Sequence, residues 1–260
     1  MAFCAWALLE HSFHILAPGT KAPNSLIVFV FTATLSAYIF CQLNSALITK
    51  SNSISRRISW VKEKLFKNCI VLIISSLIFT YQLFKLEMHI FSLVLLFGLV
   101  TSMYALKTES LNIREIPYLK LFIIAINWLF LTCFVPILYL KIDINMRSMS
   151  FLIGMFAFII TVILPFDLRD YDIDKSVNLK TIPHLISKWG VVLLSLMLSI
   201  VFYKFKTQTT PIQDNQVQLL ALICALMPLA SVGAMKIKNE YYYLVGVDGL
   251  CILLFLSTLL

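Results

Sequence analysis

Hydrophobic positions form long uncharged runs along the chain, separated by short polar segments. The run SMSFLIGMFAFIITVILPF, residues 148–166, contains no charged residue. Runs of about 20 apolar residues match the thickness of a bilayer core, and they lack the alternation typical of barrel strands. The pattern predicts an all-α, polytopic membrane protein with about nine transmembrane helices in one domain, residues 1–260. The predicted spans are 1–17, 25–43, 69–86, 89–106, 119–140, 148–166, 189–203, 217–235 and 242–260.

Composition agrees with this class. Hydrophobic residues make up 60% of the chain and charged residues only 13%, and the mean hydropathy is +0.90. A soluble domain has about a quarter charged residues, so most of this surface cannot face water. The six cysteines contain no CxxC pair, and we interpret them as small apolar residues rather than disulfide or metal ligands.

The basic residues are distributed unevenly between the predicted loops. Counted in chain order, the even loops hold most of the 21 Lys and Arg residues, and the loop 44–68 is the most basic. The positive-inside rule then places the even loops in the cytoplasm, the N-terminus inside and the C-terminus outside. The net charge of +8 favours anionic lipid head groups, whereas no basic and aromatic platform for nucleic acid is present. Nothing in the pattern indicates an obligate protein partner.

The segment DLRDYDIDKSVNLKTIP, residues 167–183, holds four of the chain's 13 acidic residues directly after an uncharged run. If the helix continues past residue 166, Asp167, Asp170 and Asp174 lie within about 60° of one another, and Asp172 points away. Three crowded carboxylates repel unless a cation lies among them. Oxygen ligands suit Mg²⁺, which bridges carboxylates to phosphate oxygens. The pattern predicts a Mg²⁺ site at Asp167, Asp170 and Asp174.

A simpler interpretation is a solvated helix end in which Arg169 and Lys175 neutralise the acids. The residues that follow favour the metal site, because Lys180 and Thr181 supply a cation and a hydroxyl group for a phosphate. Carboxylates for a metal followed by donors for a phosphate predict a diphosphate site at the cytoplasmic end of the helices.

This segment resembles the second aspartate-rich motif of the UbiA-type membrane prenyltransferase superfamily. That motif is Asp-x-x-Asp-x-x-x-Asp, followed by a Gly-Lys-x-Thr-x-Pro-like segment. Asn178 and Leu179 replace the Gly-Lys pair, whereas Thr181 and Pro183 keep their places. The segment YALKTESLNIREIPYLKLFIIAINW, residues 104–128, resembles the connection between the family's fourth and fifth helices.

The resemblance implies a UbiA-like helical bundle that transfers an isoprenyl group from a prenyl diphosphate to a lipophilic, often aromatic, acceptor. It implies that Asp167, Asp170 and Asp174 are catalytic and bind Mg²⁺, so that the diphosphate leaving group is neutralised in a water-poor site. The residues that it implies for substrate binding are Lys180, Lys107, Arg114, Asn44 and Tyr104, and Lys120 would also lie at the mouth of the site.

The chain departs from the family at the first acidic motif, Asn-Asp-x-x-Asp-x-x-x-Asp. With Asn44 aligned to its Asn, the acids are replaced by Ser45, Ile48 and Asn52, and no acidic residue occurs between positions 11 and 62. Two interpretations follow. Either the basic loop neutralises the diphosphate beside a single Mg²⁺, or the chain is a catalytically inactive, lipid-binding relative.

Other polar residues carry weaker signals. Asp248, deep in the last span, predicts either an acceptor-orienting group or a bond to a neighbouring helix. Glu10, His11 and His14 are close in sequence, but two histidines without a third ligand favour packing, and His184 is expected to cap the segment beyond residue 183. A transporter would need more Gly and Pro breaks within its spans. A purely structural role leaves the acidic segment unexplained.

Overall fold

The structure is a computed structural model that describes residues 1–48, 56–105, 116, 118–176, 179–209 and 214–259. The chain divides into two compact units. Unit 1 comprises Met1–Phe3 and Pro23–Asn112, and unit 2 comprises Cys4–Ala22 and Ile113–Leu260. All regular secondary structure in the described residues is helical, which confirms the predicted all-α class.

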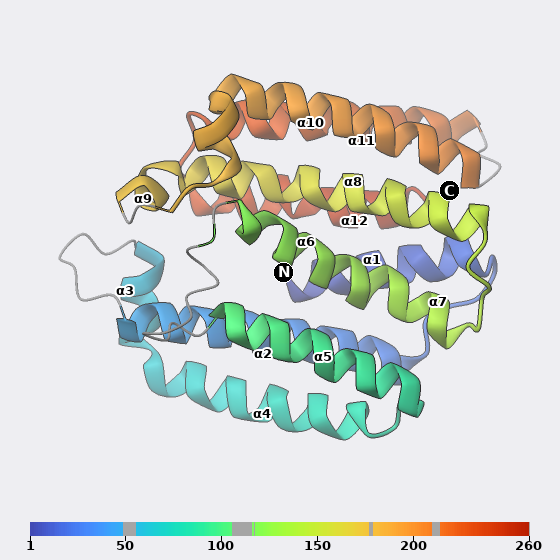
Figure 1. Ribbon diagram of the computed structural model, residues 1–260, viewed down its shortest axis with the longest axis horizontal. Helices are drawn as coiled ribbons and strands as arrows, with labels where there is room; N and C mark the ends of the chain where they lie inside the picture. The colour runs from blue at the N-terminus through green and yellow to red at the C-terminus, as the bar shows by residue number, and fades with distance from the viewer. Residues whose placement is uncertain (49–55, 106–115, 117, 177–178, 210–213, 260) are drawn as a thin grey trace. The chain divides into compact units, whose positions relative to one another are not determined.

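Unit 1 is built around one long helix. Its helices are α2 (Asn24–Ile48), α3 (Arg56–Glu63), α4 (Leu65–Leu83) and α5 (Met88–Ala105). α2 packs against each of the other three (Figure 1). A small core joins α2 to α3 through Ile39, Leu43, Ala46 and Val61.

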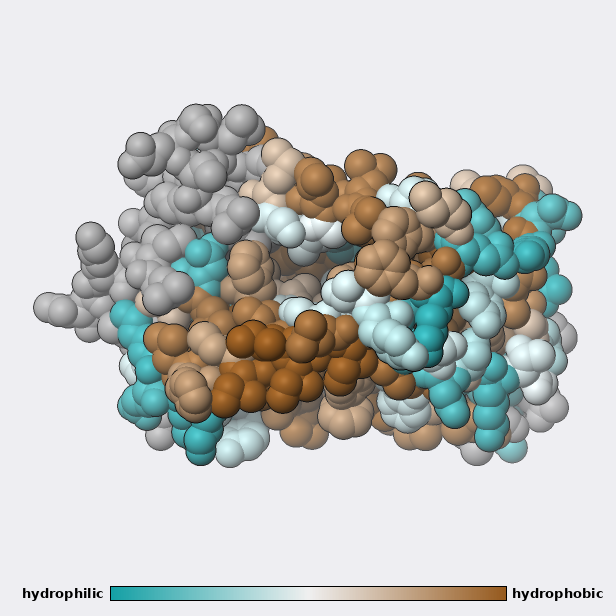
Figure 2. All heavy atoms as spheres, turned by 90° about the horizontal axis from the view of Figure 1, so that it is seen from below, coloured by the Kyte–Doolittle hydropathy of each residue, from teal (hydrophilic) through white to brown (hydrophobic). Residues whose placement is uncertain are grey.

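The outer surface of α4 is strongly hydrophobic. Phe66, Ile73 and Leu77 are exposed by 78%, 59% and 66%. On the face shown in Figure 2, hydrophobic side chains form a band along the middle, and hydrophilic side chains gather toward its two ends. Exposing apolar area to water costs about 25 cal/mol per Å². Such a surface is therefore suited to contact with lipid chains.

Unit 2 contains the remaining helices, beginning with most of α1 (Ala2–Leu16). The others are α6 (Leu119–Leu129), the π-helix η2 (Phe130–Phe134), α7 (Val135–Tyr139), α8 (Met146–Arg169), α9 (Tyr171–Ser176), α10 (Ile182–Thr209), α11 (Asp214–Ala234), the π-helix η3 (Tyr242–Val247) and α12 (Gly249–Leu256). α6, η2 and α7 form one continuous span, Leu119–Tyr139. The π-helix directly precedes Pro136 near the start of α7, where the missing proline N–H favours a local widening of the helix.

α8 is the central helix of unit 2. It packs against α6, α10 and α11, and its Phe158 ring lies 5.1 Å from that of Phe202 on α10. A Cβ atom at Gly154 would stand only 3.1 Å from the Cβ of Phe205, so a small residue permits the close approach of the two helices. The start of α8 is fixed by a capping box, in which the Asn145 side chain accepts hydrogen bonds from the N–H groups of Arg147 and Ser148.

Six helices are long and apolar enough to cross a membrane, and two shorter apolar helices, Met88–Met103 and Tyr242–Leu256, accompany them within the described residues. With α1, these account for the nine predicted spans. The chain is thus an integral, multi-pass membrane protein. One predicted end was less accurate: α10 ends at Thr209 rather than at 203, because a helix can continue past the apolar run into polar residues. At its start, the non-helical Ser187 separates residues 182–186 from the long helix, which was predicted to begin at 189.

Candidate functional site

The acidic segment lies where α8 ends and α9 begins. Asp170 is the C-cap of α8, with φ −85° and ψ 0°. The Asp170 N–H still donates to the Phe166 carbonyl at 3.0 Å, and the Asp174 N–H donates to the Asp170 carbonyl at 2.8 Å. Helical hydrogen bonding therefore continues across the interruption. This continuity keeps Asp167 and Asp174, two turns apart, on the same side.

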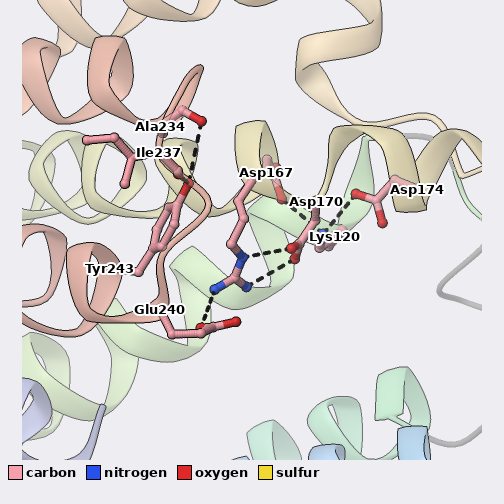
Figure 3. A network of polar contacts seen from close by, with 9 residues as sticks. Lys120, Asp167, Asp170, Asp174, Ala234, Ile237, Glu240 and Tyr243 are labelled. Carbon is pink, nitrogen blue, oxygen red and sulfur yellow. Dashed lines mark hydrogen bonds and ion pairs between the residues drawn. The ribbon is translucent and has the colours of Figure 1, made fainter. Parts of the chain in front are cut away.

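Lys120, from the first turn of α6, joins these two carboxylates. Its Nζ lies 3.0 Å from Asp167 Oδ1 and 3.1 Å from Asp174 Oδ2 (Figure 3). Asp167 is 1% exposed and Asp174 5%. Burial raises the pKa of the Asp174 carboxyl above its ordinary value, and the Lys120 ammonium group opposes that rise. A side-chain cation thus lies between two acids that the sequence assigned to a metal.

Asp170 is engaged by a different cation. Arg169 Nε donates to Asp170 Oδ1 at 2.8 Å and its Nη2 to Oδ2 at 3.3 Å, a two-pronged contact. The same guanidinium group donates to Glu240 at 3.2 Å and lies 4.8 Å from the centre of the Tyr243 ring. Asp172 lies on the surface, where it pairs with Lys238 at 3.2 Å.

The acids fit a magnesium ion in part. No group of three or more His, Cys, Asp or Glu side chains in the described segments is arranged to hold a metal. Yet Asp167 Oδ2 is buried and has no hydrogen-bond partner in the structure, although buried polar atoms nearly always have one. Carboxylate oxygens are also the ligands that Mg²⁺ prefers. Asp167 and Asp174 therefore fit the ion once Lys120 moves away from them, and Asp170 would have to leave Arg169.

A cavity of about 490 Å³ lies beside the turn between α9 and α10. Its lining residues are Tyr118, Lys175, Leu179, Lys180 and His184. Leu179 and Lys180 are held by two backbone bonds, from the Leu179 N–H to the Asp174 carbonyl at 2.8 Å and from the Tyr118 N–H to the Lys180 carbonyl at 2.9 Å. Tyr118 adopts a left-handed conformation with φ 66° immediately before α6. The same connection thus positions Lys120 and Lys180.

The remaining predicted residues belong to other parts of the chain. Asn44 lies in the last turns of α2, and the backbone of Tyr104 lies near the end of α5, both in unit 1. Lys107 and Arg114 lie outside the described residues. Of the substrate-binding residues predicted, the structure places Lys180 beside the acidic segment.

The polar residues of α1 and Asp248 make contacts within unit 2. His11 is fully buried, and its Nε2 lies 3.3 Å from Lys206 Nζ. His14 Nδ1 lies 2.9 Å from the Glu10 carbonyl. Asp248 is also buried, and its carbonyl accepts a weak hydrogen bond from the Cys4 thiol at 3.5 Å.

Comparison with known proteins gives a result at the level of fold. No protein-family model and no curated protein matches the chain. The structure of a UbiA homologue from Aeropyrum pernix K1 superposes with a TM-score of 0.70 at 12% sequence identity, covering 99% of this chain and 97% of that chain. The chain has the UbiA fold.

A second solved structure is similar over the same share of this chain. It is the structure of a digeranylgeranylglyceryl phosphate synthase, with a TM-score of 0.52 and 15% identity, covering 99% of this chain and 90% of that chain. The resemblance predicted from the second aspartate-rich motif is thus confirmed by the fold. At these identities the similarity is one of architecture, and the chemistry has to be argued from the site.

Three residues make contacts at the acidic segment or line the cavity beside it in ways that their sequence positions did not indicate. Lys120 was expected only to line the mouth, Arg169 only to neutralise a helix end, and His184 only to cap a segment. A usable signal existed for Lys120, because it is the sole charged residue of the first turn of an otherwise apolar span. Arg169 and His184 carry no local signal that separates them from surface residues.

Proposed function

We propose that this protein transfers an isoprenyl group from a prenyl diphosphate to a lipophilic acceptor within the membrane, in a Mg²⁺-dependent reaction. The observation that carries the proposal is the pair of buried carboxylates, Asp167 and Asp174, at the end of an apolar helix in a UbiA-like fold, with one carboxylate oxygen left without a partner. Buried acids are costly unless a cation or a ligand compensates them.

The second structural match supports the substrate class. A digeranylgeranylglyceryl phosphate synthase makes a product whose name describes geranylgeranyl groups on a glyceryl phosphate. An isoprenyl donor and a lipid-soluble acceptor are therefore the natural candidates here. The apolar helix α8, which ends at the site, suits both, because each would carry a long hydrocarbon chain.

The residues would act mainly on the leaving group. Asp167 and Asp174, joined by Asp170 once it leaves Arg169, would hold Mg²⁺. The ion, when bound, supplies Lewis-acid neutralisation of the diphosphate. Lys180, with Lys107 and Arg114 in the connection before α6, would hold the phosphate oxygens. As the allylic carbon–oxygen bond breaks, the electron pair leaves with the diphosphate, and the acceptor then bonds to that carbon and loses a proton.

The proposal includes the orientation of the chain in the membrane. The excess of Lys and Arg in the even loops favours a cytoplasmic location for the acidic segment, with the N-terminus inside and the C-terminus outside. The diphosphate head group of a prenyl diphosphate is soluble in water. A site at the cytoplasmic edge of the bilayer would therefore be accessible to it. We also propose that residues 1–260 act as a single functional domain.

One observation favours a second function, that of a catalytically inactive lipid-binding protein. Each of the three aspartates already has a cationic partner within the chain, Lys120 for two of them and Arg169 for the third. The absence of acidic residues between positions 11 and 62 points the same way. A protein that needs no metal would retain such internal pairs.

Binding of geranyl diphosphate to the purified protein in detergent tests the main proposal. We expect affinity to fall at least tenfold with chelator and in Asp170→Asn, whereas Asp172→Asn, a surface acid on the same segment, serves as the matched control and should bind normally. Equal affinity with and without chelator, together with normal binding by Asp170→Asn, would refute the metal–diphosphate site.

Incubation of labelled geranyl diphosphate with total membrane lipid separates the two functions. A labelled lipid product that requires Asp167 and Asp174 supports the transferase. Metal-dependent binding without any labelled product supports the inactive, lipid-binding alternative.

A further inference from the structure

His184 presents a hydrogen-bond donor that has no acceptor. The Thr181 backbone N–H donates to His184 Nδ1 at 3.4 Å, and the Thr181 hydroxyl group lies 2.8 Å from the same nitrogen. A backbone N–H can only donate, so Nδ1 is the acceptor and the proton of the neutral ring is on Nε2. His184 Nε2 is buried and makes no hydrogen bond in the structure.

The ring of His184 is held in one orientation. It stacks on Tyr171, with the ring centres 4.2 Å apart and the planes 10° from parallel. Lys188 Nζ lies 4.6 Å from the centre of the same Tyr171 ring. A buried donor that finds no acceptor costs free energy, because it has lost its hydrogen bond to water. The orientation therefore suits a ligand that supplies an acceptor.

The surroundings of His184 favour an anionic ligand. His184 lines the 490 Å³ cavity together with Lys175 and Lys180. Both lysines are exposed, and no carboxylate in the described parts of the chain pairs with either ammonium group. The Asp174 carboxylate nearby is instead directed to Lys120. Two lysines and one N–H donor thus line a cavity that has no acidic residue among its described lining residues.

We propose that His184 Nε2–H, Lys175 and Lys180 form a phosphate-binding subsite that is separate from the metal-binding carboxylates. This inference rests on the proposed function, and it assigns the distal phosphate of the prenyl diphosphate to the cavity at the turn between α9 and α10. His184 sets the direction of the hydrogen bond to the phosphate, because its N–H group is fixed whereas the lysine side chains are flexible. This subsite would neutralise the charge of the diphosphate without a metal ion. Such a contribution suits a chain that lacks the first acidic motif.

The test uses inorganic pyrophosphate and the full-length protein in detergent, titrated in chelator and again in Mg²⁺. His184→Phe keeps a ring that can stack on Tyr171 but removes the donor, and His184→Gln keeps an N–H group. His89→Phe, an exposed histidine of unit 1 paired with Glu87, is the matched control. Size-exclusion profiles and melting temperatures establish that each variant is folded.

We expect the wild type to bind pyrophosphate in chelator and His184→Phe to bind at least tenfold more weakly, a loss typical of a hydrogen bond to a charged group. His184→Gln should bind more tightly than His184→Phe, and the control should match the wild type. Unchanged affinity in folded His184→Phe would overturn the subsite. So would the absence of pyrophosphate binding in chelator, even if Mg²⁺-dependent binding of geranyl diphosphate preserved the proposed function.

Two further measurements test whether the subsite depends on the transferase proposal and whether its phosphate comes from a lipid head group. If pyrophosphate binding depends on His184 but labelled geranyl diphosphate yields no product and shows no dependence on Asp170, the subsite stands and the transferase proposal fails. Competition by dioctanoyl phosphatidic acid tests a lipid head group as the phosphate source. Tight, His184-dependent binding of that lipid without pyrophosphate binding would overturn the assignment to a diphosphate.

Discussion

Lys120 gives the acidic segment a cation that belongs to the protein itself. Its ammonium group lies within 3.1 Å of both Asp167 and Asp174, so the two buried acids are compensated when no ligand is bound. A metal ion at the same carboxylates would compete with this ammonium group. The displaced lysine would then be free to contact the diphosphate, which couples the two binding events.

Lys120→Met is expected to bind Mg²⁺ more tightly than the wild type, because the competing charge is gone and the two carboxylates repel. Without metal, the variant should be less stable by about 2 kcal/mol, since two buried acids lose their partner. Thermal unfolding in detergent across a Mg²⁺ titration measures both effects. Lys120→Arg, which keeps the charge, is the control. An identical Mg²⁺ midpoint in Lys120→Met and the wild type would contradict the competition.

Arg169 restrains Asp170 in a comparable way. Its contacts with Asp170, Glu240 and the Tyr243 ring tie the end of α8 to the segment after α11. We expect Arg169→Gln to release Asp170 toward the other acids and to lower the Mg²⁺ concentration needed for half-maximal thermal stabilisation. Arg147→Gln, a basic residue at the opposite end of α8, serves as the control. A higher Mg²⁺ requirement in Arg169→Gln would show that Arg169 supports the metal site rather than competing with it.

Among the helices, α10 contains the clearest irregularity. Ser187 has φ 68° and ψ 167° inside the assigned helix, a region occupied almost only by glycine. Its hydroxyl group accepts a hydrogen bond from the Gly190 N–H at 3.3 Å, as an N-cap residue would. The short turn of 182–186, which carries His184, is therefore set at an angle to the rest of α10 by one strained residue.

Ser187→Gly should be at least as stable as the wild type, because glycine relieves strain of about 1–3 kcal/mol and loses only a few tenths for the cap. Ser187→Ala keeps the strain and loses the cap, so it should be less stable by about 1 kcal/mol. Melting temperatures of the two variants in the same detergent provide the comparison. The backbone assignment would be wrong if the alanine variant proved the more stable.

At the scale of the whole molecule, labelling can test the orientation proposed for the chain in the membrane. Asp172, after α8, has a side chain that is 65% exposed, and Ile144, before α8, is 63% exposed. Asp172→Cys should react with a membrane-impermeant maleimide only after cells are permeabilised, whereas Ile144→Cys should react in intact cells. The wild type gives the background, because its described cysteines are buried or half-buried. The reverse pattern would overturn the proposed orientation.

Much of the architecture followed from local pattern. Uncharged runs of bilayer length predicted the helices and the membrane class, because an isolated backbone in lipid must satisfy its own hydrogen bonds. The spacing of Asp167, Asp170 and Asp174 also indicated a UbiA-like fold, and the structural matches confirmed that fold. Roles for Asn44, Tyr104, Lys107 and Arg114 stay predictions.

The amino-acid sequence alone determined that the chain is helical, spans a membrane and carries three acids at one helix end, because these properties depend on composition and on spacing within a few turns. Only the tertiary structure decided which cation each acid meets. Lys120 is 54 residues from Asp174 along the chain, and the unused donor of His184 depends on how one turn is set against α9. Such contacts depend on packing between distant segments, and no local pattern encodes them.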